Sequence, residues 1–212
     1  MKRVKPPFRA DHVGSLLRTA PVRDARDKLK RGEITAEALR EIEDREIEKI
    51  IRRQEEVGLQ AVTDGEFRRS WWHLDFLWGL DGIERYQMEQ GIAFSGMRTR
   101  TEGARAIGKV GFSGHPMLDH FAFLKSRTMR MPKMTIPSPS ALYGRTGREA
   151  VSEKAYPSLS EFFADWGEDL RRRGPRVRRR RLPLPAARRS VHPTPVRCQL
   201  SAEAAGARPR SR

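Results

Sequence analysis

The chain has 212 residues and a formal net charge of +16, and its length suits one domain with an appended segment. No run of about 18 consecutive apolar residues occurs, which excludes a membrane-spanning helix, and the basic N-terminus lacks the apolar stretch of a signal peptide. The single cysteine, Cys198, excludes an intrachain disulfide and a cysteine-based zinc cluster, so we expect a cytoplasmic protein.

The positive charge is concentrated at one end of the chain. Residues 1–169 carry 29 Lys/Arg and 26 Asp/Glu, whereas residues 170–212 carry 14 arginines, no lysine and one acidic residue, Glu203. We therefore expect a domain over residues 1–169 and an Arg/Pro-rich, disordered tail over residues 170–212.

The domain begins with alternating strand and helix patterns. Residues 8–17 predict a strand that runs into a loop at Gly14, and Thr35 is the predicted N-cap of a helix that ends near Val57. Residues 59–66 predict a buried strand. A strand, a helix of about 20 residues and a second strand form a βαβ unit, so the two strands are expected to be parallel neighbours.

The rest of the domain continues this alternation. The sequence predicts an aromatic cluster over residues 71–78, a β-hairpin over 92–112, a helix over 115–126 and a strand over 129–136. A last helix is expected from Tyr156 to Leu170, which places the charge boundary inside a helix. The predicted fold class is α/β, with three β/α units.

Polar residues gather where the predicted parallel strands end, in residues 12–15, 64–66 and 137–140. Parallel strands bring their carboxyl ends to one side, so these clusters are expected to meet in one cleft. There Glu66 would receive a substrate ammonium group, and the amide groups around Gly14 and Ser15 would hold a carboxylate. Each cluster taken alone also fits an ordinary turn.

Other candidate sites are weaker. His12, His73, His115 and His120 lack the spacing of metal ligands and are interpreted as surface or core residues. The aromatic cluster is interpreted as packing, because no basic stripe is interleaved with it.

Four motifs resemble the cobalamin-independent methionine synthase family, in its short bacterial members that are similar to the catalytic C-terminal domain. They are His-Val-Gly-Ser-Leu-Leu-Arg from residue 12, Gln-Glu-Glu-Val-Gly-Leu from 54, Val-Thr-Asp-Gly-Glu-Phe-Arg-Arg from 62 and Thr-Ile-Pro-Ser-Pro from 135. The resemblance extends from about Pro6 to Asp169, the N-terminal part only.

The resemblance implies a (β/α)₈ barrel that uses zinc to activate the thiol of homocysteine for methyl transfer from methyltetrahydrofolate. It implies that Val13, Gly14 and Ser15 contact the amino acid and that Glu66 holds its ammonium group. It also implies a methyl-donor region near four consecutive residues, namely Pro137, Ser138, Pro139 and Ser140.

The chain also departs from the family. The family's metal ligands are a His-x-Cys pair, a Glu and a later Cys in the second half of the barrel, and no such residues occur here. A thiol without a metal stays mostly protonated at neutral pH and is a poor nucleophile. Three β/α units also cannot close an eight-stranded barrel, so we expect an incomplete barrel with an open sheet edge and no methyl transfer by this chain.

The tail has two interpretations. The run of arginines from Arg171 to Arg181 would bind nucleic acid nonspecifically through phosphates. Alternatively, the tail is the next part of the gene translated out of frame, because Arg, Pro, Ala and Gly dominate shifted translation of GC-rich coding sequence. Residues 181–189 can be encoded so that a shift of one base reads Gly-Cys-Arg-Tyr-Leu-Gln-Leu-Asp, which resembles the family's next strand.

The stretch from Leu170 likewise admits a shifted reading, Tyr-Ala-Glu-Glu-Val-Arg-Ala, that would continue the helix. We therefore favour a truncated, frameshifted family member. The alternatives are another zinc-dependent thiol alkyltransferase of the superfamily, such as one acting on coenzyme M, and a basic nucleic-acid-binding protein.

Overall fold

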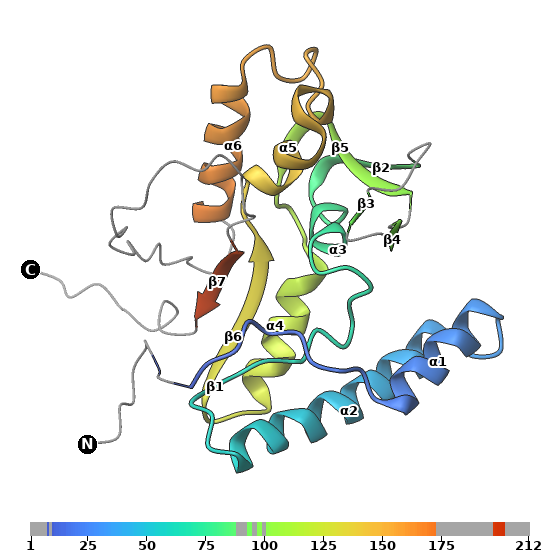
Figure 1. Cartoon of the computed structure of the whole chain (residues 1–212). Helices are drawn as coiled ribbons and strands as arrows, with labels where there is room; N and C mark the ends of the chain where they lie inside the picture. Colours follow the sequence, from blue (N-terminus) through green and yellow to red (C-terminus); the bar gives the residue numbers. More distant parts are fainter. Residues whose placement is uncertain are drawn as a thin grey trace, which may run out of the picture. The chain divides into compact units, whose positions relative to one another are not determined.

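The computed structural model describes Phe8 and residues 10–87, 93–94, 97–98, 101–172 and 197–201 (Figure 1). The chain divides into two compact units. The first comprises the described residues of Met1–Trp72, Met117–Thr135 and Gln199–Arg212, and the second those of His73–Pro116 and Ile136–Cys198.

The first unit is built on a helical pair, α1 (Ala20–Lys30) and α2 (Ala36–Glu56), which lie side by side (Figure 1). Thr35 caps α2 as predicted, since its hydroxyl accepts a hydrogen bond from the amide of Ala38 at 3.2 Å. The helix ends one residue before Val57, so the prediction for this helix is confirmed.

A three-stranded sheet in the order β1-β6-β7 is formed by β1 (Ala61–Val62), β6 (Met131–Pro137) and β7 (Arg197–Ser201). The strands β1 and β6 are parallel, with Ala61 opposite Met131 and Val62 opposite Pro132. The helix α4 (Pro116–Ser126) precedes β6 in the chain, so the predicted helix and strand of this region are confirmed.

The core of the first unit joins both helices of the pair and α4 to β1. Its fully buried side chains are apolar and come from all four elements and the turn after β1; they are Val22, Ile47, Ile51, Val62, Phe67 and Leu124.

The strand predicted over residues 8–17 is wrong, because residues 10–17 contain no strand in the structure. The reason lies in Gln54 of α2, whose side-chain amide bonds both backbone groups of Thr63. Its Nε2 donates to the Thr63 carbonyl at 2.8 Å, and its Oε1 accepts from the Thr63 amide at 2.9 Å. These groups are therefore not available to a ladder with residues 10–17, and β1 pairs with β6 instead.

Replacing Gln54 by leucine is expected to lower the free energy of unfolding by about 2 kcal/mol, because the buried amide and carbonyl of Thr63 lose their partner. The ring of His12, whose Nε2 lies 2.9 Å from Gln54 Oε1, loses a partner as well. Urea unfolding measures the change. Gln60→Leu is the control, because the side chain of Gln60 is less buried and bonds the exposed Gly58 carbonyl and the side chain of Arg130 rather than a buried peptide group. Equal stability of the two variants would contradict this role of Gln54.

The second unit contains an antiparallel hairpin of β2 (Asp81–Gln87) and β5 (Glu102–Gly111). The short helix α3 (Leu74–Leu77) precedes it, and β3 (Ala93–Phe94) and β4 (Met97–Arg98) pair between its strands. A hairpin was predicted over residues 92–112. The antiparallel pair of β3 and β4 lies inside that range, whereas the longer strand β5 takes its partner, β2, from upstream of it.

The hairpin strand β5 packs against the later elements η1 (Gly147–Ala150) and α6 (Leu159–Arg172), and η1 in turn contacts α5 (Ser140–Thr146). The amide of Val110 donates to the Tyr156 hydroxyl at 2.7 Å, and the ring of Phe162 meets those of Tyr156 and Trp166 edge-on. As predicted, α6 crosses Leu170.

The tail was predicted to be disordered, and most of it lies outside the described residues. Its residues Arg197–Ser201 differ from the prediction, because they form β7 at the edge of the sheet. Cys198 and Leu200 alternate with polar residues, which is the period of a strand, and an unpaired sheet edge presents amide and carbonyl groups that such a segment can bond.

Candidate functional site

The turn after β1 places a carboxylate in an unusual backbone conformation. Gly65 and Glu66 have φ values of 67° and 58°, and Glu66 is the one non-glycine residue with positive φ in the described part of the chain. Asp64 Oδ1 accepts from the Glu66 amide at 2.9 Å, and Thr63 Oγ1 accepts from the Gly65 amide at 3.1 Å. The left-handed conformation costs about 1–2 kcal/mol, so the surrounding contacts must hold Glu66 there.

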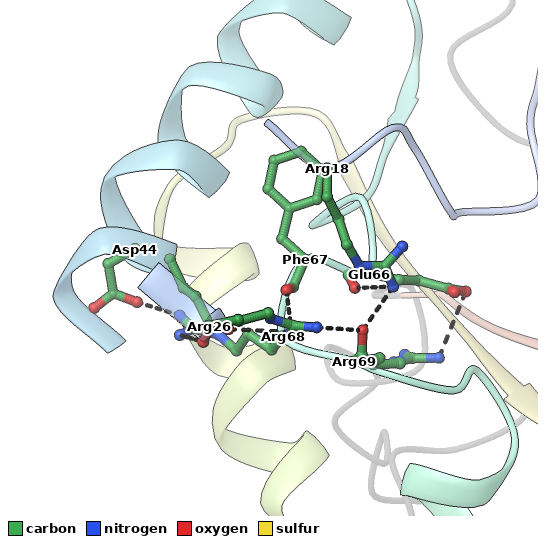
Figure 2. A network of polar contacts seen from close by, with 8 residues as sticks. Arg18, Arg26, Asp44, Glu66, Phe67, Arg68 and Arg69 are labelled. Atoms are coloured by element: carbon green, nitrogen blue, oxygen red, sulfur yellow. Dashed lines mark hydrogen bonds and ion pairs between the residues drawn. The ribbon is translucent and has the colours of Figure 1, made fainter. Parts of the chain in front are cut away.

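Two arginines from outside the turn hold its carbonyl groups (Figure 2). Arg18 donates to the carbonyls of Glu66 at 3.1 Å and Arg69 at 2.6 Å. Arg26 of α1 donates to the carbonyls of Phe67 and Arg69, the latter at 3.0 Å. These contacts fix the backbone that follows the Glu66 side chain, and the bonds to Thr63 and Asp64 fix the backbone before it.

Acidic residues of α2 balance these arginines. Glu43 accepts from Arg26 at 3.2 Å, and Arg68 pairs with Asp44 and, at 3.5 Å, with Glu43. Burial raises the pKa of Glu43, while the neighbouring guanidinium groups of Arg26 and Arg68 act in the opposite direction. The helical pair thus anchors the turn that carries Glu66.

Gly14 lies directly against the Glu66 carboxylate. A Cβ atom on Gly14 would be 3.5 Å from Glu66 Oε1 and 3.0 Å from Thr135 Oγ1 of β6, and its φ of +150° is rare for side-chain-bearing residues. The Gly14 carbonyl accepts from Thr63 Oγ1 at 2.7 Å, and the Thr135 hydroxyl donates to the Val13 carbonyl. Two strand-end threonines therefore hold residues 13–14 beside Glu66.

The amide groups of Gly14 and Ser15 donate no hydrogen bond to any residue that the structure describes. Val13 and Ser15 are exposed, whereas Gly14 is buried. The segment is also tied to β6 by the buried Lys133, whose Nζ donates to Asp11 Oδ1 at 2.5 Å and to the carbonyl of His12.

Glu66 and Arg69 form a buried ion pair. Glu66 Oε1 lies 3.5 Å from Arg69 Nη1, and both side chains are almost fully buried. Arg69 Nη1 also donates to the Thr135 carbonyl at 2.6 Å. In Figure 2 the side chains of Glu66 and Arg69 point to the same side of the turn, away from Asp44.

Of the three predicted clusters, the structure brings residues 12–15 and 64–66 together. Residues 137–140 belong to the second unit: Pro137 ends β6, Ser140 begins α5, and the hydroxyls of Ser138 and Ser140 lie 2.7 Å apart. Their place in a common cleft stays a prediction.

Arg69, Thr135 and Lys133 were not predicted as residues of the site. Arg69 stands in a stretch of mixed acidic and basic residues, which is typical of a surface position. For Lys133 and Thr135 the sequence did carry a signal, because these two polar residues interrupt an otherwise apolar strand. Both are buried and lie at alternate positions of β6, so they share one face of that strand.

The described residues do not fit a zinc ion, because no three His, Cys, Asp or Glu side chains among them are grouped as ligands. Within the same residues, no helix has the length and apolar character needed to span a membrane.

The fold and site define a mixed α/β domain with a buried carboxylate at the end of a parallel strand. Residues 8–99 match the family described as cobalamin-independent synthase, catalytic domain. The Bacillus subtilis (strain 168) protein YxjH is 48% identical over 168 residues, which are 79% of this chain and 44% of YxjH. The N-terminal part of this chain is therefore similar to the cobalamin-independent methionine synthase family, over the residues that the family model matches.

Two further relatives carry names that describe an activity. The 5-methyltetrahydropteroyltriglutamate–homocysteine methyltransferase of Thermosynechococcus vestitus is 49% identical over 65 residues, 31% of this chain and 9% of that protein. A crystal structure from Listeria monocytogenes, provisionally assigned as a vitamin-B12-independent methionine synthase, is 42% identical with a TM-score of 0.58. The match covers 77% of this chain and 45% of the Listeria chain. The chain thus spans less than half the length of these relatives.

Proposed function

We propose that residues 1–169 are the first part of a methyltransferase barrel that transfers a methyl group from methyltetrahydrofolate to a homocysteine-like thiol. The observation that carries the proposal is the buried Glu66 carboxylate, held in a left-handed turn against Gly14. A backbone strain of this kind is retained at sites that need a side chain in one place.

The proposed ligand is the amino-acid acceptor. Val13, Gly14 and Ser15 would contact it. The backbone amides of Gly14 and Ser15, which donate to no described residue, would bind its carboxylate, and Glu66 would bind its ammonium group. The methyl donor would lie near residues 137–140. Support comes from the family match and from the names of relatives such as the Thermosynechococcus methyltransferase.

We further propose that this chain alone does not transfer methyl groups, because it is truncated by a shift of reading frame near Leu170. The composition changes there, inside α6, and the match with YxjH covers 168 residues, 79% of the chain. The described residues do not fit the family's zinc ion.

Two genes test the proposal: the gene as it is, and a version with one base inserted or removed near codon 170. With zinc and methyltetrahydrofolate, the corrected product is expected to methylate homocysteine and the present chain is not. Coenzyme M is offered as a second acceptor: methylation of homocysteine indicates the homocysteine enzyme, and methylation of coenzyme M indicates another thiol alkyltransferase. Zinc-dependent turnover by the present chain, or a nucleotide sequence that encodes no barrel in the other frame, would overturn the truncation.

A further inference from the structure

Arg69 carries a charge that its surroundings satisfy only in part. Its relative exposure is 1%, and Nη1 alone has partners, the Thr135 carbonyl at 2.6 Å and Glu66 Oε1 at 3.5 Å. Its Nε and Nη2 are buried and make no hydrogen bond to any residue that the structure describes. A permanently charged group with bare buried donors is costly unless something else binds them.

The bare atoms form one edge of the guanidinium plane. The Nε–H and one Nη2–H bond point in nearly the same direction, which is the edge that receives the two oxygens of a carboxylate. The bond from Arg69 to the Thr135 carbonyl of β6 uses Nη1 alone, so anchoring β6 does not account for the burial of the Nε–Nη2 edge.

The neighbouring Arg68 differs in its surroundings. It too has bare nitrogens, but its charge meets the carboxylates of Asp44 and Glu43 and the ring face of Phe123, 5.1 Å from its Cζ. Arg69 meets the single carboxylate of Glu66.

We propose that the Nε–Nη2 edge of Arg69 binds the carboxylate of the amino-acid ligand whose ammonium group lies on Glu66. The assignment rests on the proposed function and identifies the ligand class as an α-amino acid zwitterion. An α-amino acid carries its ammonium and carboxylate groups on one carbon. Glu66 Oε1 and Arg69 Nη1 present the complementary charges 3.5 Å apart, and Gly14 approaches the same carboxylate so closely that an added Cβ would lie 3.5 Å from Glu66 Oε1. Arg69 shares the carboxylate with the amides of Gly14 and Ser15.

The test measures binding of three probes to the full chain by calorimetry: methionine, its analogue without the carboxylate (3-(methylthio)propylamine) and its analogue without the amine (4-(methylthio)butanoate). Arg69→Gln is expected to weaken methionine and the butanoate by about 10- to 100-fold, since it removes charge-assisted hydrogen bonds, and to leave the amine within about twofold. Glu66→Gln is expected to weaken methionine and the amine instead. Arg23→Gln, which removes an exposed charge of α1, is the control.

Arg69→Lys keeps the charge without the two-pronged edge and is expected to recover only part of the affinity, so it serves where the glutamine variant does not fold. Equal weakening of all three probes, or of none, would overturn the assignment.

If the chain binds no methionine, the proposed ligand class fails. The Arg69 Nε–H resonance, assigned by its absence from the Arg69→Lys spectrum, then tests the anion site separately. A saturable shift with 4-(methylthio)butanoate supports the site, and no shift overturns it.

Discussion

Replacing Arg26 by methionine is expected to lower the free energy of unfolding by about 3–5 kcal/mol. Methionine keeps much of the apolar stem but leaves the buried Glu43 carboxylate short of a partner and removes the donors to the Phe67 and Arg69 carbonyls. The carboxylate of Glu43 then keeps only the more distant Arg68, at 3.5 Å, and a buried charge that loses its hydrogen-bonded partner is more costly than the loss of one ordinary contact. Urea unfolding followed by tryptophan fluorescence measures the change.

Two further variants show whether the loss of stability comes from the contacts of Arg26. Arg23→Met changes an exposed arginine on the same helix and is expected to cost less than about 0.5 kcal/mol. Adding Glu43→Gln to Arg26→Met removes the negative charge of the Glu43 carboxylate, and is expected to restore at least about 1 kcal/mol of the free energy of unfolding. If Arg26→Met is no less stable than Arg23→Met, the turn does not depend on Arg26.

Stability is expected to fall in mild acid because of His120 in α4. Burial, followed by the positive charge of Arg68, lowers the pKa of His120 to about 4 from its usual 6.5, with smaller influences from Asp64, Arg69 and Arg40. Below pH 6.5 the unfolded chain binds a proton that the folded chain does not bind. Stability therefore decreases as the pH falls from about 6.5 to about 4, by about 3 kcal/mol in all.

Urea unfolding of the natural chain and of His120→Gln at several pH values isolates this effect from the titration of carboxylates. The stability difference between the two proteins is expected to change by about 2 kcal/mol between pH 7.5 and pH 5, in the direction that favours the glutamine variant at pH 5. A difference that does not vary with pH would show that His120 takes up its proton in the folded state.

Local signals in the sequence predicted the elements that depend on local contacts. Thr35 caps α2 as expected, and the strand and helix patterns near residues 131 and 159 correspond to β6 and α6. Pairings between distant segments were predicted less well. Nothing near residues 8–17 indicates that a glutamine side chain of α2 occupies the backbone of Thr63, and β5 takes a partner upstream of the range predicted for its hairpin.

In the candidate site, too, features that depend on local sequence were predicted better than contacts between distant segments. The motif Asp-Gly-Glu and the glycine at position 14 pointed to a turn and a close approach, and the structure places Gly14 against Glu66. Arg69 was missed because its burial depends on β6, 66 residues further along the chain at Thr135. Charged residues are assigned to the surface by default, and their pairing in the interior is visible only in three dimensions.

The left-handed backbone at Glu66 places two opposed demands on one position. Glycine and asparagine adopt this conformation at much lower cost than glutamate, so the backbone by itself favours one of them at residue 66. The buried guanidinium of Arg69 requires a carboxylate at the same residue. A substitution that relaxes the backbone therefore leaves a buried positive charge without its partner, so strain and charge at residue 66 cannot both be relieved by one change.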